Sequence, residues 1–125
     1  MSEPTYVQEY NAIGEVLNKY LEGNAKGNSA ATKLAFHAQA TFFGVSGDEV
    51  VGPEIQNLYD IVDTLPPSPN ARTAIARIDV AGTAANARVD SENVAGQRFT
   101  DFFNLLKIEG RWIIVNKVYH MHPVA

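Results

Sequence analysis

The stretch RFTDFFNLLKIEGRWIIVNKVYHM, from Arg98 to Met121, decides the fold predicted for this chain. It contains two apolar runs separated by Glu109 and Gly110, a pair typical of the turn that joins two antiparallel strands. We therefore predict one long hairpin. Five aromatic residues lie in it, the densest cluster in the chain: Phe99, Phe102, Phe103, Trp112 and Tyr119.

Three segments before this hairpin have the spacing of apolar residues that is typical of helices. The first is expected over about residues 5–24, and Thr5 followed by Gln8 fits a capping box at its start. A shorter helix is predicted from Asn28 or Ser29 through about Phe36, burying Leu34. The third is expected to begin at Gly52 and Pro53 and to end before a cluster of prolines.

The remaining segments alternate apolar and polar residues, as strands do. Residues 38–45 predict a short strand that turns back into Glu49–Val51, and Thr73–Val80 predicts another. Ala85, Ala87 and Val89 would face one side of the strand that follows. This order predicts an α+β fold with three N-terminal-half helices packed on one face of an antiparallel sheet, and a pocket where the helices leave the sheet uncovered.

Length and composition exclude several classes of protein. A chain of 125 residues with 46% hydrophobic residues is expected to be a single domain, residues 1–125, with its own core. Ten basic and fourteen acidic residues, without a basic cluster, argue against a nucleic-acid partner. The absence of cysteine excludes disulfides and thiol catalysis. Without a signal-like or membrane-spanning segment, we expect no membrane partner and a cytoplasmic location.

The hairpin, together with AFHAQATFFGVSG (35–47) and VAGTAANARV (80–89), resembles the nuclear transport factor 2-like superfamily of cone-shaped α+β barrels. Within it, the chain is most similar to SnoaL-like proteins and to the branch labelled "putative lumazine-binding". The resemblance covers nearly the whole chain and implies a curved sheet with helices on its concave face. The superfamily includes isomerases, dehydratases, cyclases and ligand binders. Its ketosteroid-isomerase-like members carry a general-base aspartate on the first strand after the second helix, where this chain has residues 41–45, TFFGV.

Asp101 and Lys117 are charged residues inside otherwise apolar strands, where an unpaired charge is costly. If Gly110 forms a bulge after a three-residue turn, Asp101 faces Lys117. A two-residue loop would place Val118 opposite Asp101 instead. We favour the bulge. The pair has two interpretations, a catalytic role for Asp101 or an ordinary cross-strand ion pair on the outer or dimer face of the sheet.

His37 is the other catalytic candidate, as a general acid or base oriented by Asp101. The alternative is a histidine that interacts with the last carbonyls of the second helix, and nothing local distinguishes the catalytic role from this one. His37, His120 and His122 could in principle bind a metal ion, but exposed C-terminal histidines are the favoured interpretation. Candidate ligand-binding residues are Tyr10, Tyr59, Trp112, Asn116, Lys117 and His120, with Trp112 alternatively in the core.

These features predict a pocket for a small, partly apolar molecule, in a lyase or isomerase that uses no cofactor or in a noncatalytic binder. A dimeric interaction domain is the alternative. The adjacent pairs Leu105–Leu106 and Ile113–Ile114 must point to opposite faces of their strands, so that both faces of the sheet are apolar. We therefore expect a homodimer through the outer sheet face, with Ile113 and Val115 among its contacts.

Overall fold

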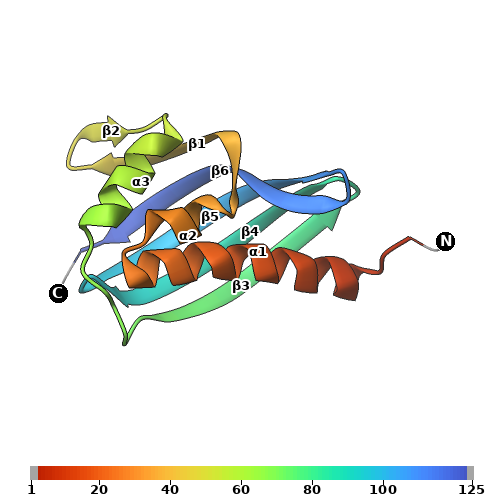
Figure 1. The fold of residues 1–125 in the computed structure, drawn as a ribbon, viewed down its shortest axis with the longest axis horizontal. Helices are drawn as coiled ribbons and strands as arrows, with labels where there is room; N and C mark the ends of the chain where they lie inside the picture. The colour runs from red at the N-terminus through yellow and green to blue at the C-terminus, as the bar shows by residue number, and fades with distance from the viewer. Residues whose placement is uncertain (1–2, 124–125) are drawn as a thin grey trace.

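The computed structural model describes residues 3–123, which form three helices and one six-stranded sheet (Figure 1). The helices are α1 (Tyr6–Lys26), α2 (Ser29–Lys33) and α3 (Ile55–Thr64). The strands are β1 (Phe36–Ser46), β2 (Glu49–Val51), β3 (Arg72–Ala81), β4 (Ala84–Val94), β5 (Gln97–Ile108) and β6 (Arg111–His122). None of the helices in this part of the chain is long and apolar enough to cross a membrane.

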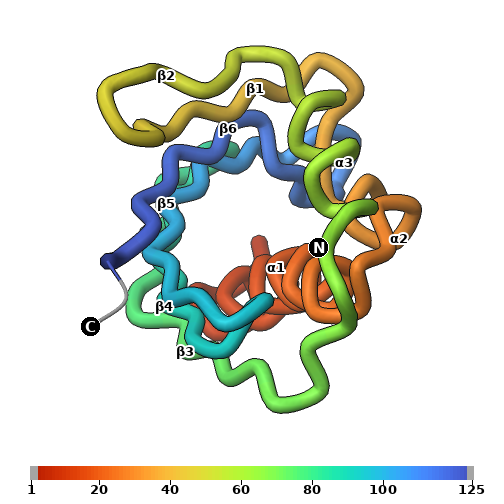
Figure 2. The backbone as a smooth tube through the Cα atoms, turned by 90° about the vertical axis from the view of Figure 1, so that its left-hand side faces the viewer, coloured from red at the N-terminus to blue at the C-terminus, as the bar shows by residue number. Residues whose placement is uncertain are grey.

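The strands follow the order β2-β1-β6-β5-β4-β3 in a curved sheet. Figure 2 shows them in an open arc, with the helices on the other side of the enclosed space. This confirms the predicted α+β fold with helices on the concave face. One pair departs from the antiparallel pattern, because β1 runs parallel to β6. Such a pairing joins segments distant in sequence, so it could not be predicted from local turn signals.

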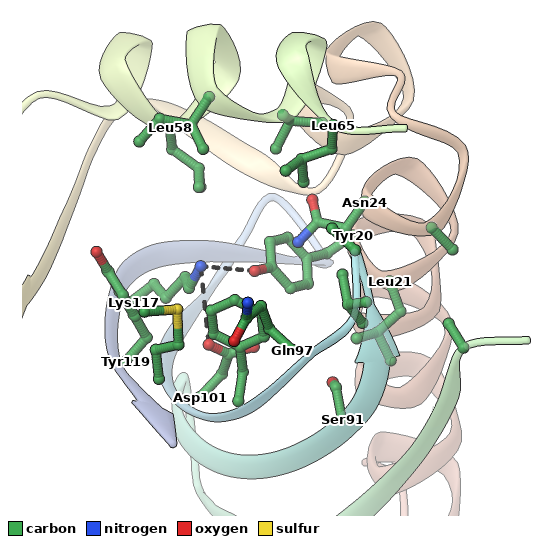
Figure 3. Close-up of a pocket in the computed structure, with 18 of the residues that line it drawn as sticks. Tyr20, Leu21, Asn24, Leu58, Leu65, Ser91, Gln97, Asp101, Lys117 and Tyr119 are labelled. Carbon is green, nitrogen blue, oxygen red and sulfur yellow. Dashed lines mark hydrogen bonds and ion pairs between the residues drawn. The ribbon is translucent and has the colours of Figure 1, made fainter. Parts of the chain in front are cut away.

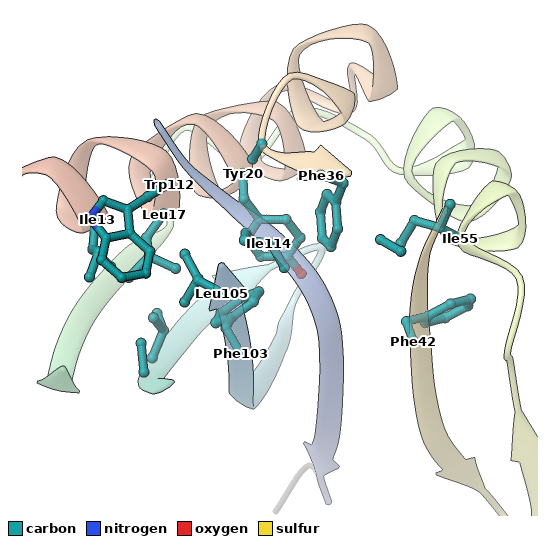
Figure 4. Packing of buried hydrophobic residues seen from close by; sticks show 14 of the residues in the cluster. Ile13, Leu17, Tyr20, Phe36, Phe42, Ile55, Phe103, Leu105, Trp112 and Ile114 are labelled. Carbon is teal, nitrogen blue, oxygen red and sulfur yellow. The ribbon is translucent and has the colours of Figure 1, made fainter. Parts of the chain in front are cut away.

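Helix α1 lies across the concave face and buries one stripe of its surface. Its predicted capping box is present, with the Thr5 side chain accepting from the Gln8 backbone N–H and the Gln8 side chain accepting from that of Thr5. The helix ends at Gly27, whose φ of 63° is left-handed. Its buried residues Ile13, Leu17 and Tyr20 form the core with side chains of β5 and β6, notably Phe103, Leu105, Trp112 and Ile114 (Figure 4).

Two of the predicted helix boundaries are wrong. Helix α2 ends at Lys33, so Leu34 is 71% exposed while Phe36 is buried at the start of β1. His37 consequently lies in a strand and not at the end of a helix. Helix α3 begins at Ile55, after a cis Gly52–Pro53 peptide, with Glu54 as its N-cap. Proline is therefore outside the helix, where its missing N–H costs no helical hydrogen bond.

The hairpin of β5 and β6 has neither of the predicted registers. Glu109 and Gly110 form a two-residue turn with φ of 51° and 78°, as in type I′ turns. The bulge lies in the strand instead, at Val115, where Asn104 pairs with Asn116 but Leu105 pairs with Ile114. As a result Tyr119 lies opposite Asp101, and Lys117 lies opposite Phe103. Asp101 and Lys117 are diagonal neighbours that share the concave face of the sheet.

The outer face of the sheet is not covered by any helix of the described chain. A row of hydrogen bonds crosses it, from Asn86 to Asn104 at 2.9 Å, from Asn104 to Asn116 at 3.2 Å, and from Asn116 to Thr41 at 3.1 Å. Exposed apolar side chains accompany this row, namely Phe43, Phe102, Leu106 and Val118. Ile113 and Val115, named above as dimer contacts, are half-buried.

Candidate functional site

A cavity of about 520 Å³ lies between the concave face of the sheet, the C-terminal half of α1 and α3 (Figure 3). Its volume is within the usual range for sites that bind small molecules. Most of its wall is apolar, and its lining residues include Leu21 from α1, Leu58 and Val62 from α3, and Phe99 from β5. The predicted pocket between the helices and the sheet is therefore present.

Three polar side chains meet in the wall of this cavity. The Nζ atom of Lys117 donates a hydrogen bond to the Tyr20 hydroxyl at 2.6 Å and lies 3.7 Å from Oδ1 of Asp101 (Figure 3). All three residues are buried, with exposed fractions of 4% for Lys117, 1% for Tyr20 and 3% for Asp101. Asp101 and Lys117 therefore form an ion pair as diagonal neighbours inside the cone, whereas the favoured register, with the two residues directly opposite each other, is wrong.

Regular periodicity places Tyr20 and Asp101 in this cluster, and a strand bulge places Lys117. Tyr20 is three residues after Leu17, so it continues the buried stripe of α1. Asp101 alternates with Phe99 and Phe103 along β5, and all three face the concave side. The bulge at Val115 is what brings Lys117 to this side, because alternation from Ile114 would otherwise point residue 117 outward.

Burial and mutual attraction act in opposite directions on these groups. Burial raises the pKa of the Asp101 carboxyl, and the nearby Lys117 charge partly offsets the rise. Burial lowers the pKa of the Lys117 amine, and Asp101 partly restores it. The pKa of Tyr20 is raised well above its usual value, first by burial and then by the Asp101 charge. The acid and the base are thus closer in proton affinity than a surface Lys–Asp pair, which favours proton transfer.

One acceptor in the cluster, Oδ1 of Asp101, has an ion-pair partner in Lys117 but accepts no hydrogen bond from the described part of the chain. Oδ1 of Asp101 is buried and makes no hydrogen bond within the described residues. A buried carboxylate oxygen normally accepts at least one hydrogen bond, so this atom can take a proton or a hydrogen bond from a bound molecule. Lys117 and Tyr20 supply donors beside it. The arrangement can bind the polar end of a small molecule while the apolar wall contacts the rest.

His37, the other catalytic candidate, is in a different place. It lines a separate, more open depression near the N-terminal half of α1, with Glu9, Lys107 and Trp112. Its Nδ1 accepts a hydrogen bond from the backbone N–H of Gln39 at 3.0 Å. The structure therefore does not bring His37 to Asp101, and the expectation that Asp101 orients His37 is wrong. The physical reason is that β1 already begins at Phe36, so His37 lies in the first residues of this strand and lines the depression beside the N-terminal half of α1.

Most of the predicted ligand-binding residues lie away from the cavity. Lys117 lines it, but Tyr10, Tyr59, Trp112, Asn116 and His120 are absent from the part of its wall that the structure describes. Tyr59 and Trp112 pack in the core, whereas Tyr10 is exposed and contacts Tyr6. Asn116 belongs to the outer row of hydrogen bonds, and exposed His120 contacts His122. Within residues 3–123 no group of three His, Cys, Asp or Glu side chains could hold a metal ion, so the three-histidine site is not formed.

Two residues of the site were missed from the sequence. Tyr20 lies on the buried stripe of α1, and a tyrosine on such a stripe brings a polar tip into an apolar space. Tyr119 follows Lys117 by two residues and shares its face, and the Lys117 amine lies 4.9 Å from the ring centres of both tyrosines. Two tyrosines on the buried faces of their elements could have signalled this site, had the register been known.

Comparisons with known proteins agree with this fold. A family model described as "Putative lumazine-binding" matches residues 8–120. "Aldolase FrzH" from Cladobotryum sp. is 32% identical over 116 residues, which are 92% of this chain and 93% of that protein. An NTF2-like protein of unknown function from Shewanella baltica is 56% identical with a TM-score of 0.95, covering 98% of this chain and 100% of its own. A similar protein of unknown function from Methylobacillus flagellatus is 42% identical with a TM-score of 0.90, covering 98% and 99%.

Proposed function

Since the chain belongs to the "Putative lumazine-binding" family of the NTF2-like superfamily, we propose that it is a lyase or isomerase that moves a proton on a small carbonyl compound. Its own side chains supply the acid and the base. The observation that carries this proposal is the Asp101–Lys117–Tyr20 cluster, with a carboxylate oxygen that accepts no hydrogen bond from the described residues, in the wall of a largely apolar cavity.

In the proposed reaction the substrate's carbonyl oxygen accepts hydrogen bonds from Lys117 and Tyr20. The Asp101 carboxylate removes a proton from the carbon next to the carbonyl. The donors stabilise the negative charge that develops on oxygen, an effect that contributes about 100- to 1000-fold per donor in other enzymes. A general base adds about 100- to 10,000-fold. Burial of all three groups strengthens these interactions because little water competes for them.

The relative called an aldolase supports this assignment. Aldol chemistry begins with removal of a proton next to a carbonyl group, which requires a base beside donors for the oxygen. That protein is 32% identical to this chain over nearly the full length of both. We propose carbonyl chemistry of the same kind here, on a substrate whose apolar part fits the cavity between α1, α3 and the sheet.

The test is exchange of the α-protons of benzylacetone, a methyl ketone with one apolar arm, in deuterated buffer followed by NMR. The wild-type protein should accelerate the exchange, and Asp101→Asn should slow it by at least about 100-fold, because the amide cannot accept the proton. Asp79→Asn, which changes an exposed carboxylate on β3, is the matched control and should exchange at the wild-type rate. A thermal shift on ketone binding without exchange would contradict the enzyme proposal and indicate a binder.

A further inference from the structure

Resting on the proposed function, we infer that Lys117 also acts as a nucleophile, and that its Nζ attacks the carbonyl carbon of an aldehyde or ketone in the cavity to form an imine. This role goes beyond donation of a hydrogen bond. It also narrows the substrate class to carbonyl compounds that are not carboxylic acids or amides.

The Lys117 amine is placed where a lysine can act as a nucleophile. Among the described residues that line the cavity, Lys117 is the one lysine, and its side chain is 6% exposed. Its Nζ lies 4.9 Å from the ring centre of Tyr20 and 4.9 Å from that of Tyr119. A lysine in such surroundings has lost most of its hydration shell, which a surface ammonium keeps. Desolvation is one of the recognised ways in which proteins activate a lysine for imine formation.

The groups facing the amine can carry the protons that the reaction requires. The titratable groups around Nζ are Tyr20 from α1, Asp101 from β5 and Tyr119 from its own strand. Asp101 accepts a proton from the ammonium and leaves a neutral amine. Burial lowers the pKa of that amine, so the neutral form is reached at a lower pH than on a surface lysine.

The reaction balances without an oxidant or reductant. The nitrogen lone pair forms the C–N bond while the π electrons of the carbonyl move to its oxygen, which takes a proton from the Tyr20 hydroxyl. The nitrogen of this adduct returns one of its protons to the Tyr20 oxygen, which restores the hydroxyl and leaves a lone pair on nitrogen. The proton held by Asp101 then passes to the former carbonyl oxygen, which leaves as water while the nitrogen lone pair forms the C=N bond. The sum is one ammonium and one carbonyl giving one protonated imine and one water. The positive charge then lies next to the Asp101 carboxylate, which stabilises it and can remove the neighbouring α-proton.

The hydrogen bond between Tyr20 and the Lys117 amine gives the tyrosine a role in this reaction. The hydroxyl lies 2.6 Å from Nζ, so any carbonyl oxygen displaced from a carbon bonded to Nζ would emerge close to the tyrosine. The same donor that orients the carbonyl before attack is therefore beside the oxygen after attack. Tyr20 is itself fixed by packing, because its ring contacts Phe36 and Phe103 edge to face.

The inference is tested by reductive trapping on the wild-type protein. The protein is incubated with benzylacetone and sodium cyanoborohydride, and the adduct is located by intact-mass measurement and peptide mapping. The expected result is one adduct per chain, on Lys117, with Lys19, Lys26, Lys33 and Lys107 unmodified. Lys117→Arg should give no adduct while keeping a positive charge, and this variant should also lose at least about 100-fold in α-proton exchange.

The outcomes separate the two proposals. Wild-type exchange without an adduct on Lys117 would overturn the imine and leave the noncovalent proton transfer standing. Equal labelling of the surface lysines would overturn the imine as well, because it would show ordinary amine reactivity. Absence of both adduct and exchange would overturn both proposals. Trapping on the wild-type chain needs no variant, so the test remains decisive even if Lys117→Arg does not fold.

Discussion

Removal of either charge from the buried Asp101–Lys117 pair should destabilise the fold much more than removal of both. Asp101→Asn leaves an ammonium buried without its partner, and Lys117→Met leaves a buried carboxylate. Each single change is expected to cost about 3–5 kcal/mol. In the double variant no buried charge remains. The attraction across 3.7 Å is about 4.5 kcal/mol at an effective dielectric constant of about 20, and each single change already removes all of it, so the second change removes no further attraction. We therefore expect a coupling energy of at least about 2 kcal/mol.

The measurement is a double-mutant cycle by urea unfolding, with TMAO added to all four proteins if a single variant is largely unfolded in water. Arg72 and Glu92 provide the matched control, since this ion pair has a shorter separation of 2.9 Å but exposed side chains. Its cycle should give less than about 1 kcal/mol because water screens both charges. A coupling energy for Asp101 and Lys117 no larger than that of the control would refute the reasoning from burial.

Three further predictions concern pH, His37 and assembly. In Lys117→Met the pKa of the Asp101 carboxyl should rise further, because the nearby positive charge is gone. The unfolded chain then releases this proton at a lower pH than the folded chain, so the free energy of unfolding should fall as the pH increases from about 4. Urea titrations that show the wild-type dependence on pH would contradict this. His37→Ala should leave α-proton exchange unchanged, and a large loss would place the reaction in the other depression. The outer face of the sheet should form the interface of a homodimer, and Phe102→Asp or Val118→Asp should dissociate it. The measurement is equilibrium sedimentation at micromolar concentration, and a monomeric wild-type protein would contradict this expectation.

The parts of the fold that local sequence determines were predictable. The capping box at Thr5, the buried stripe of α1 and the alternation of β4 depend on residues within a few positions of each other. The parallel pairing of β1 with β6 was not predictable, because it joins segments about eighty residues apart through no turn signal. The bulge at Val115 also has no turn residue to mark it, and it decided which face Lys117 occupies.

The residues of the candidate site were likewise predictable where local sequence marks them and unpredictable where tertiary packing places them. Asp101 and Lys117 were found from sequence because a charge inside an apolar strand is conspicuous whichever way the strand is turned. Tyr20 was missed because its role depends on α1 crossing the sheet at the level of Lys117, which is a property of tertiary packing. His37 was misplaced because a difference of a few residues at the end of α2 moved it from a helix end into β1.

The energetics of the cluster argue for a site and not for a structural device. Removing two charges from water costs several kcal/mol for each ion, and apolar residues of similar volume in these positions would often be as stable or more stable. Here the cost is not fully offset even within the protein, since Oδ1 of Asp101 is buried without a hydrogen-bond partner. A bound molecule that donates to this oxygen would recover that energy on binding, and so would raise the stability of the folded protein in proportion to its affinity. The feature that destabilises the fold is thus also the feature that a substrate with one polar end would recognise.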